Sequence, residues 1–322
     1  MTQLEKELQD VSNVAIAGHI HPDGDSVGSC IGLWQYLRDN YPQIKADIWL
    51  EQPDNKFSII EGYEELKQPD GQDRTYDLFI SVDCAALDRL GDALPYFQKA
   101  KRTFCVDHHV SNHGFADENV ILPDASSACE VLCSLMDPEK INKQAACALY
   151  MGIAHDTGVF QYSCTAPETM EAAAELLRKG VNGSDIIDKT FYEKTYVQNQ
   201  ILGKALLESM MVLDKKCIFS YVSKRDMEFF DAVPSDLEGI VSQLRYTTGI
   251  EVAIFMYETG YQEYKVSLRS KDAVDVSKIA KYFGGGGHVK AAGCTMKGTV
   301  HDVVNNLMKE IDIQLKAIGT KE

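Results

Sequence analysis

Histidines and aspartates occur in short stretches of this sequence at spacings that suit the binding of divalent cations. The first stretch places His19, Asp23 and Asp25 within seven residues, with Pro22 and Gly24 between them. Pro22 fixes its own backbone angle and Gly24 allows a sharp bend, so one turn holds an imidazole and two carboxylates. Such groups repel and desolvate one another unless cations neutralise them. The stretch therefore predicts a metal site.

Further groups of the same kind follow apolar runs later in the chain: Asp83, Asp107, His108, His109 and Asp156. Of all these, His19, Asp23, Asp25, Asp83, His108 and Asp156 form a set of oxygen and nitrogen ligands without cysteine, which favours Mn²⁺ or Mg²⁺ over a structural zinc. The carboxylates exceed what one ion needs, so the set predicts two ions. Asp83, at the tip of an expected central strand, is the candidate that bridges them.

Three groups beside these ligands have different expected roles. His109 is placed to donate a hydrogen bond to a phosphate oxygen, and Asp107 is placed to orient a histidine. For His21 the sequence leaves two roles open, a contact with substrate or a solvated position in the turn.

The elements that must position these side chains alternate between short apolar strands and helical patterns. The expected strands are 14–17, 46–50, 76–83 and 103–109, and the expected helices include one from Asn142, a plausible N-cap. This alternation predicts an open, mainly parallel α/β sheet flanked by helices. Ligands bind beyond the carboxyl ends of the strands in such sheets, where the candidate residues fall.

The second part of the chain predicts a smaller α/β domain with a mixed sheet, including strands at 217–222, 251–257 and 263–270. Residues 184–213 are predicted to be continuously helical. We therefore expect three parts, namely a metal-binding catalytic domain over 1–190, a helical connector over 191–213 and a substrate-binding domain over 214–322.

Four consecutive glycines precede His288 in this second part. Such a run is expected to be too flexible to serve packing alone, and to expose backbone N–H groups to a ligand. Arg269 lies on a neighbouring expected strand and can grip phosphate with two parallel hydrogen bonds, although a surface ion pair is its alternative. Gly285, Gly286, Gly287, His288 and Arg269 are thus expected to clamp a phosphate or a base.

Composition limits the classes of function. The chain has 322 residues, a formal net charge of −16 and nine cysteines, none in a Cys-x-x-Cys pair. We expect no membrane span and no signal peptide, and a cytoplasmic protein with reduced thiols. The acidity argues against gripping long duplex nucleic acid, but bound cations would let an anionic substrate approach.

These motifs resemble, in order and spacing, those of the DHH phosphoesterase superfamily. The matching stretches are 19–26, Val82-Asp83, Asp107-His108-His109 and Asp156-Thr157-Gly158. The glycine run with His288, followed by Ala291-Ala292-Gly293, is similar to the signature of the DHH-associated C-terminal domain. Within the superfamily the chain resembles most the free-standing nanoRNase (oligoribonuclease) and 3′-phosphoadenosine-5′-phosphate phosphatase type.

The resemblance implies two Mn²⁺ ions, or Mg²⁺ or another divalent cation in their place. It assigns one ion to His19, Asp23 and Asp83, and the other to Asp25, Asp83, His108 and Asp156. His109 would contact the scissile phosphate, and Arg269 and His288 would hold the remainder of the nucleotide. The implied reaction is attack by a water that the two cations activate.

The implied substrates are short RNA oligonucleotides or dinucleotides, cleaved to mononucleotides, and the 3′-phosphate of 3′-phosphoadenosine 5′-phosphate. A homodimer is implied as well. A phosphodiesterase of cyclic di-AMP or of linear dinucleotides stays open, as does cleavage polarity.

Three competing functions have features of the sequence against them. A RecJ-like single-strand exonuclease would need a basic groove and usually an extra oligonucleotide-binding barrel. An inorganic pyrophosphatase of the superfamily would carry a different C-terminal domain. A non-catalytic nucleotide-binding protein would be expected to lack at least one ligand.

Overall fold

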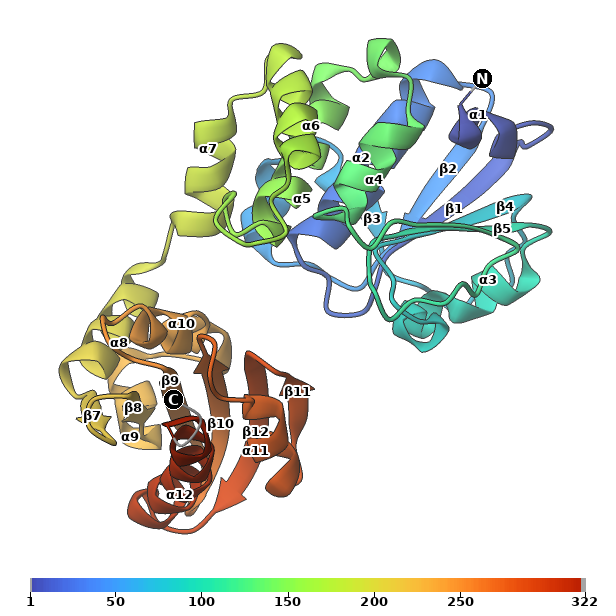
Figure 1. Ribbon diagram of the computed structural model, residues 1–322. Coiled ribbons are helices and arrows are strands. Elements are labelled where there is room, and N and C mark those ends of the chain that lie inside the picture. The colour runs from blue at the N-terminus through green and yellow to red at the C-terminus, as the bar shows by residue number, and fades with distance from the viewer. Residues whose placement is uncertain (1, 320–322) are drawn as a thin grey trace. The chain divides into compact units, whose positions relative to one another are not determined.

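The computed structural model describes residues 2–319, and its internal contacts divide the chain into two compact units. The first unit is Met1–Glu193 and the second is Lys194–Glu322 (Figure 1). Each unit is built on its own six-stranded sheet.

The sheet of the first unit is entirely parallel, with the strand order β3-β2-β1-β4-β5-β6. Its strands are β1 (Asn13–Ala17), β2 (Lys45–Trp49), β3 (Leu66–Lys67), β4 (Leu78–Val82), β5 (Thr103–Asp107) and β6 (Glu118–Ile121). This confirms the α/β fold class predicted from the alternation of apolar strands and helical patterns.

Side chains that alternate along the central strands fill two layers of core. Val14 and Ile16 of β1 face one layer, together with the helices α2, α4 and α5. Ala15 and Ala17 face the other, which contains Phe79 and the segment around α3. The helices of this unit are α1 (Gln3–Glu7), α2 (Gly24–Asn40), α3 (Leu94–Lys99), α4 (Ala128–Leu135), α5 (Lys143–Asp156), α6 (Pro167–Arg178) and α7 (Gly183–Ile187). Because both faces of the sheet are covered, the central strands are mainly apolar and almost fully buried.

The second unit has the predicted mixed sheet, with the strand order β11-β12-β10-β9-β8-β7. Within the described residues, β8–β9 is its only parallel pair of neighbouring strands. The strands are β7 (Met210–Val212), β8 (Cys217–Val222), β9 (Val252–Gly260), β10 (Glu263–Ser270), β11 (Gly286–His288) and β12 (Ala291–Lys297).

The two faces of this second sheet are covered unequally. The helices are α8 (Tyr196–Leu207), α9 (Lys224–Phe230), α10 (Ile240–Arg245), α11 (Val276–Tyr282) and α12 (Val300–Gly319). On one face, α11 and α12 pack against β8, β9, β10 and β12. On the other, α8 and α10 pack against β8 and β9, and the core cluster there includes no described residue of β10 or β12. The apolar core on that face therefore ends at β9, although α10 also lies near β10.

The prediction of a continuous helix over 184–213 is wrong. The helical path runs through α7 and a π-helical turn, Asp188–Tyr192, and then breaks, because Glu193 and Thr195 have extended backbones. Thr195 caps α8 by accepting a hydrogen bond from the N–H of Gln198. Met210–Val212, inside the expected connector, pairs instead as an edge strand with β8. Thr195 is a favoured residue type for the start of a helix, so the chain ends one helical segment before it and begins another after it.

We predict that Gly28→Ala destabilises the first unit by about 1–3 kcal/mol, the usual effect of overpacking. A Cβ at Gly28 would lie 2.5 Å from the carbonyl oxygen of Ala148, where α2 packs against α5, and backbone cannot move aside cheaply. Gly203, inside α8, has nothing within 4 Å of an added Cβ among the described residues. Gly203→Ala is therefore the control, with an expected gain of about 0.5–1 kcal/mol. Urea denaturation followed by circular dichroism tests both, and equal effects would contradict the packing argument.

Candidate metal centre

The candidate ligands of the first unit gather at the carboxyl ends of β1, β4 and β5 and at the last residue of α5. The structure forms two sets of three whose ligand atoms lie within 4.8 Å of one another: His19, Asp23 and Asp83, and Asp25, His108 and Asp156. A third set of the same kind joins Asp83, Asp107, His108 and His109. The fold thus brings together side chains from separate segments of the chain.

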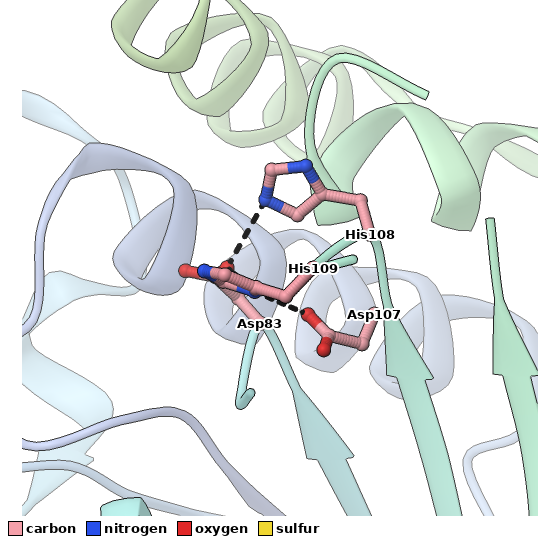
Figure 2. Close-up of side chains that lie close together, drawn as sticks. All are labelled: Asp83, Asp107, His108 and His109. Carbon is pink, nitrogen blue, oxygen red and sulfur yellow. Dashed lines mark hydrogen bonds and ion pairs between the residues drawn. The ribbon is translucent and has the colours of Figure 1, made fainter. Parts of the chain in front are cut away.

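Asp83 occupies the centre of this arrangement. One of its carboxylate oxygens, Oδ2, lies 3.3 Å from Nε2 of His19, and the other, Oδ1, lies 3.6 Å from Nε2 of His108. The residue is 2% exposed and has a left-handed backbone, with φ of 51°. Figure 2 shows His108 reaching toward Asp83 from the next strand end. A carboxylate placed between two histidines in this way is suited to bridge two cations.

The two aspartates of the first turn are held by different backbone groups. Asp23 caps α2, where its Oδ1 accepts hydrogen bonds from the N–H groups of Asp25 and Ser26. The carboxylate of Asp25 is buried and accepts from the N–H groups of Ala128 and Cys129, at 2.6 and 3.0 Å. These donors open α4, whose N-terminus favours negative charge. Each carboxylate is therefore oriented before any ion arrives.

His19 is oriented by a carbonyl to which the sequence alone does not point. Its Nδ1 lies 2.8 Å from the carbonyl oxygen of Ile20, which also accepts a hydrogen bond from Arg89 at 3.1 Å. The backbone N–H of Ile20 donates in turn to the carbonyl of Arg89. With Nδ1 so engaged, Nε2 faces the carboxylates, as a metal-binding histidine requires.

His109 is held by a second chain of hydrogen bonds. Its Nδ1 lies 2.8 Å from Oδ1 of Asp107 (Figure 2), and Asp107 is fully buried. The other oxygen of Asp107, Oδ2, accepts a hydrogen bond from the side-chain amide of Asn112 at 2.7 Å. That amide also donates to the carbonyl of Cys84, beyond β4. Asp107 thus contacts a histidine, as expected. Asn112 was missed, and the only sequence signal for it was the position of a short polar residue three places after the Asp-His-His triplet.

Charge crowding shifts the pKa values of the cluster. Burial alone would lower the pKa of His19, but the nearby carboxylates of Asp23 and Asp83 outweigh it and raise the pKa to about 11. The same holds for His108: burial lowers its pKa, but the carboxylates of Asp156 and Asp83 outweigh this effect and raise the pKa to about 11. Burial raises the pKa of Asp25, and its carboxylate neighbours raise it further. The carboxylates of the cluster carry more negative charge than its histidines can neutralise.

The donor set fits divalent cations. It consists of carboxylates and imidazoles, and two buried atoms that face the cluster, Oδ2 of Asp83 and Nε2 of His108, have no hydrogen-bond partner among the described residues. Buried polar atoms rarely lack a hydrogen-bond partner unless a water molecule or an ion binds to them. Positive ions would supply that missing partner and would take the place of protons on the histidines.

His21 does not belong to these ligand sets, and Arg269 and His288 belong to the sheet of the second unit. The side chain of His21 is 81% exposed, and its Nδ1 lies 3.1 Å from a carboxylate oxygen of Glu51. Arg269 of β10 donates to the carbonyl of Leu268 and pairs in register with Ala291, which pairs with His288. Cross-strand partners share a face of the sheet, so Arg269 and His288 lie on the same face.

The glycine run was expected to be too flexible to serve packing alone, but half of it, Gly286 and Gly287, is part of a strand. Gly286–His288 is the edge strand β11, paired with β12. A Cβ at Gly285 would lie 2.1 Å from the carbonyl oxygen of Gly293, and one at Gly287 would lie 2.5 Å from that of Ala291. These two glycines serve close packing of strands, whereas Gly286 faces open space.

The parallel sheet and the carboxylate–histidine cluster at its strand ends define a metal-dependent phosphoesterase. Family models agree: one described as the DHH family, N-terminal domain, matches residues 13–153, and one described as the DHHA1 domain matches residues 214–317. The chain belongs to the DHH superfamily of phosphoesterases that carry a DHHA1 domain.

Two relatives of similar length carry the same name. The chain is 29% identical over 290 residues to the "Bifunctional oligoribonuclease and PAP phosphatase NrnA" of Thermus thermophilus, covering 88% of this chain and 84% of that protein. It is 26% identical over 302 residues to the protein of the same name from Bacillus subtilis, covering 92% and 93%.

Among solved structures, an exopolyphosphatase-related protein from Bacteroides fragilis superposes with a TM-score of 0.85 at 23% identity, over 96% of this chain and 94% of its own. This likeness shows the fold. Within the described residues 2–319, none of the helices has the length and apolar character needed to cross a membrane.

Proposed function

We propose that this protein is a Mn²⁺-dependent phosphoesterase that hydrolyses short oligoribonucleotides and dinucleotides to mononucleotides, and that also removes the 3′-phosphate of 3′-phosphoadenosine 5′-phosphate. The observation that carries the proposal is the pair of ligand sets around Asp83. The shared name of the relatives supports the choice of substrate class.

In this proposal His19, Asp23 and Asp83 hold one ion, and Asp25, Asp83, His108 and Asp156 hold the other. Bound divalent cations would lower the pKa of water and neutralise charge on the phosphate. The chain's own contribution is orientation, because the start of α4 fixes Asp25 and the Ile20 carbonyl fixes His19. The resulting arrangement needs little rearrangement when ions and substrate bind.

His109 is proposed to contact the scissile phosphate. Its hydrogen bond to Asp107 raises the pKa of the imidazole, which favours the protonated form. Since Nδ1 is engaged by Asp107, Nε2 is the atom that can donate to a phosphoryl oxygen. Negative charge builds on those oxygens as the nucleophile attacks, so a donor placed there stabilises the transition state more than the ground state.

The second unit is proposed to bind the remainder of the nucleotide. Arg269 and His288 lie on one face of its sheet, with the small residue Ala291 between them in register. The unit would recognise the substrate through phosphate contacts of Arg269, the backbone of Gly285, Gly286 and Gly287, and the imidazole of His288. Catalysis would then belong to the first unit and substrate binding to the second.

We predict that Arg269→Ala raises KM for a dinucleotide by about tenfold, the effect of losing one charge-assisted hydrogen bond. The effect on a minimal diester, bis(p-nitrophenyl) phosphate, should be clearly smaller, because that compound has no distant phosphate to hold. Lys297→Ala, which removes an exposed cation elsewhere on the same sheet, is the matched control. Equal changes in KM for both substrates would remove Arg269 from the binding site.

The test of the function is a hydrolysis panel with Mn²⁺, with EDTA as control. It contains a 5′-phosphorylated RNA dinucleotide, long single-stranded RNA and DNA, cyclic di-AMP, 3′-phosphoadenosine 5′-phosphate and pyrophosphate. Mononucleotide release from the dinucleotide, with little attack on long strands, is expected. Preference for a long strand, for cyclic di-AMP or for pyrophosphate would replace the proposed substrate class, and full activity in EDTA would overturn metal dependence.

We also propose a cytoplasmic location and a homodimer. The nine cysteines are free, and six of them are buried: Cys30, Cys84, Cys105, Cys129, Cys217 and Cys294. Free, buried thiols suit a reducing compartment. The dimer rests on the family resemblance alone, and light scattering coupled to gel filtration measures it directly.

A further inference from the structure

The second unit contains a pocket beside Arg269 that the proposed clamp does not use. Its volume is about 560 Å³. It is lined by Pro234, Ser235, Leu237, Glu238, Gly239, Val241, Phe255, Tyr257, Lys265, Ser267 and Arg269. All of these residues belong to the second unit, so the pocket is complete within it.

Strand register explains why the pocket exists. Lys265, Ser267 and Arg269 alternate along β10 and therefore share one face, whereas Val266 and Leu268 between them enter the core on the opposite face. Opposite them on β9 are Tyr257, Phe255 and Ala253, in that order. The core that α8 and α10 form on this face stops at β9, so the segment 234–241 overhangs the sheet and leaves a hollow beside β10.

The lining is apolar at the base and polar at the rim. Leu237, Val241 and Phe255 are nearly fully buried, whereas Glu238 and Lys265 are exposed. Tyr257 is half-buried between these two zones and presents an aromatic ring. The pocket thus combines buried apolar residues with several polar and charged groups, and its volume lies within the range of small-molecule sites.

We propose that this pocket binds a nucleobase of the substrate, the base of the nucleotide whose phosphate Arg269 contacts. Tyr257 would stack on the base, since every base offers a π-face to an aromatic ring. The carboxylate of Glu238 can accept a hydrogen bond from an exocyclic amino group, and it would repel a second phosphate. The pocket therefore fits a base with an amino group, such as adenine, better than it fits another phosphate.

This inference rests on the proposed function, which it deepens by giving the second unit a site for the base as well as for the phosphate. Arg269 would then lie between His288 and the base pocket. The strands β12 and β11 are on one side of β10, with His288, and the base pocket is on the other, beside β9. Recognition of a base together with its phosphate is one way to favour short nucleotides over simple phosphate esters.

The first experiment measures binding without catalysis. Adenosine 5′-monophosphate and ribose 5-phosphate are titrated into the full chain in EDTA, by calorimetry. We expect adenosine 5′-monophosphate to bind about tenfold more tightly than ribose 5-phosphate, a ratio in the range of one stacked base. Tyr257→Ala should reduce that ratio to about one, whereas Tyr261→Ala, at a tyrosine 91% exposed outside the pocket, should retain it. A ratio near one in the natural sequence, or an unchanged ratio in Tyr257→Ala, overturns the proposal.

A second variant covers the case in which Tyr257→Ala does not fold. Ser267→Leu places a larger side chain on the pocket side of β10, and it should also reduce the ratio to about one. The matched control is Thr295→Leu, which adds a similar side chain to an exposed position of β12 outside the lining. An unchanged ratio in Ser267→Leu would reject the pocket as the base site.

The same titration separates this proposal from the proposed function. Asp83 belongs to the first unit. The affinity of the Asp83→Asn variant for adenosine 5′-monophosphate in EDTA should therefore equal that of the natural sequence. If the panel of substrates shows no hydrolysis while base-dependent binding is present, the proposed function fails and the base site stands. If dinucleotides are hydrolysed without base-dependent binding, the proposed function stands and the base site fails.

Discussion

Replacing Asp83 with asparagine is expected to lower kcat/KM for a dinucleotide by about 10³-fold or more with the fold intact. The carboxylate lies between the two ligand sets, so its loss weakens both at once. Metal ions contribute several kcal/mol to charge stabilisation in such reactions, and each 1.36 kcal/mol is a factor of ten. Asparagine is a better probe than alanine, because it retains the shape of the side chain and tolerates the left-handed backbone at this position.

Metal stoichiometry is the second measurement on this variant. Calorimetric titration with Mn²⁺ should give two ions for the natural sequence and at most one for Asp83→Asn. Asp88→Asn removes an exposed carboxylate five residues further on and is expected to behave like the natural sequence. Turnover at the natural rate in Asp83→Asn would disprove the two-ion arrangement, provided that circular dichroism shows both variants folded.

His109→Asn is expected to lower kcat by about 10²–10³-fold while two Mn²⁺ ions still bind. This range is typical for the loss of one donor to a developing oxyanion or of one acid–base group. Loss of kcat and loss of metal binding should be separable in this variant. His109 contacts Asp107 through Nδ1 and belongs to neither of the two three-residue ligand sets around the proposed ions. A drop in metal stoichiometry would make His109 a ligand, and an unchanged kcat would remove it from the reaction.

Asp107→Asn completes this prediction. Asparagine at that position can still hydrogen-bond to His109, but it no longer favours the protonated imidazole. We expect kcat to fall less than in His109→Asn, and its decline with rising pH to begin at lower pH, since the pKa of His109 is no longer raised by a carboxylate. Asp117→Asn, which removes a carboxylate that accepts from Thr103 at the opposite end of β5, is the control.

The parallel sheet and the proximity of the candidate ligands could be predicted because both depend on local signals. Buried parallel strands are continuous apolar runs, and the residue types that bind cations were found where those runs end, as for Asp83 after β4 and Asp107 in β5. Topology then brings such ends to one edge of the sheet. The sequence also predicted Asn142 as the cap of α5, where its side chain accepts from the N–H of Ala145.

Features that depend on contacts between distant segments were not predicted. Asn112 was missed because one of its partners, the carbonyl of Cys84, becomes its neighbour only in the fold. Arg89 was missed for the same reason, since it acts on the Ile20 carbonyl from a segment nearly seventy residues away. The close packing of Gly285 and Gly287 was not predicted, because flexibility and close packing both favour glycine and only the position of β12 distinguishes them.

The packing of the glycine run also makes Gly286 a place to attach a reporter. Gly285 and Gly287 have no room for a side chain, and Gly284 has φ of 78°, whereas a Cβ at Gly286 meets nothing within 4 Å among the described residues. A cysteine introduced there could carry a fluorophore two residues from His288, on the strand that the proposed clamp uses. Cys164 is exposed and would be labelled as well, so the experiment requires Cys164→Ser. Emission from such a label would follow nucleotide arrival and departure in real time.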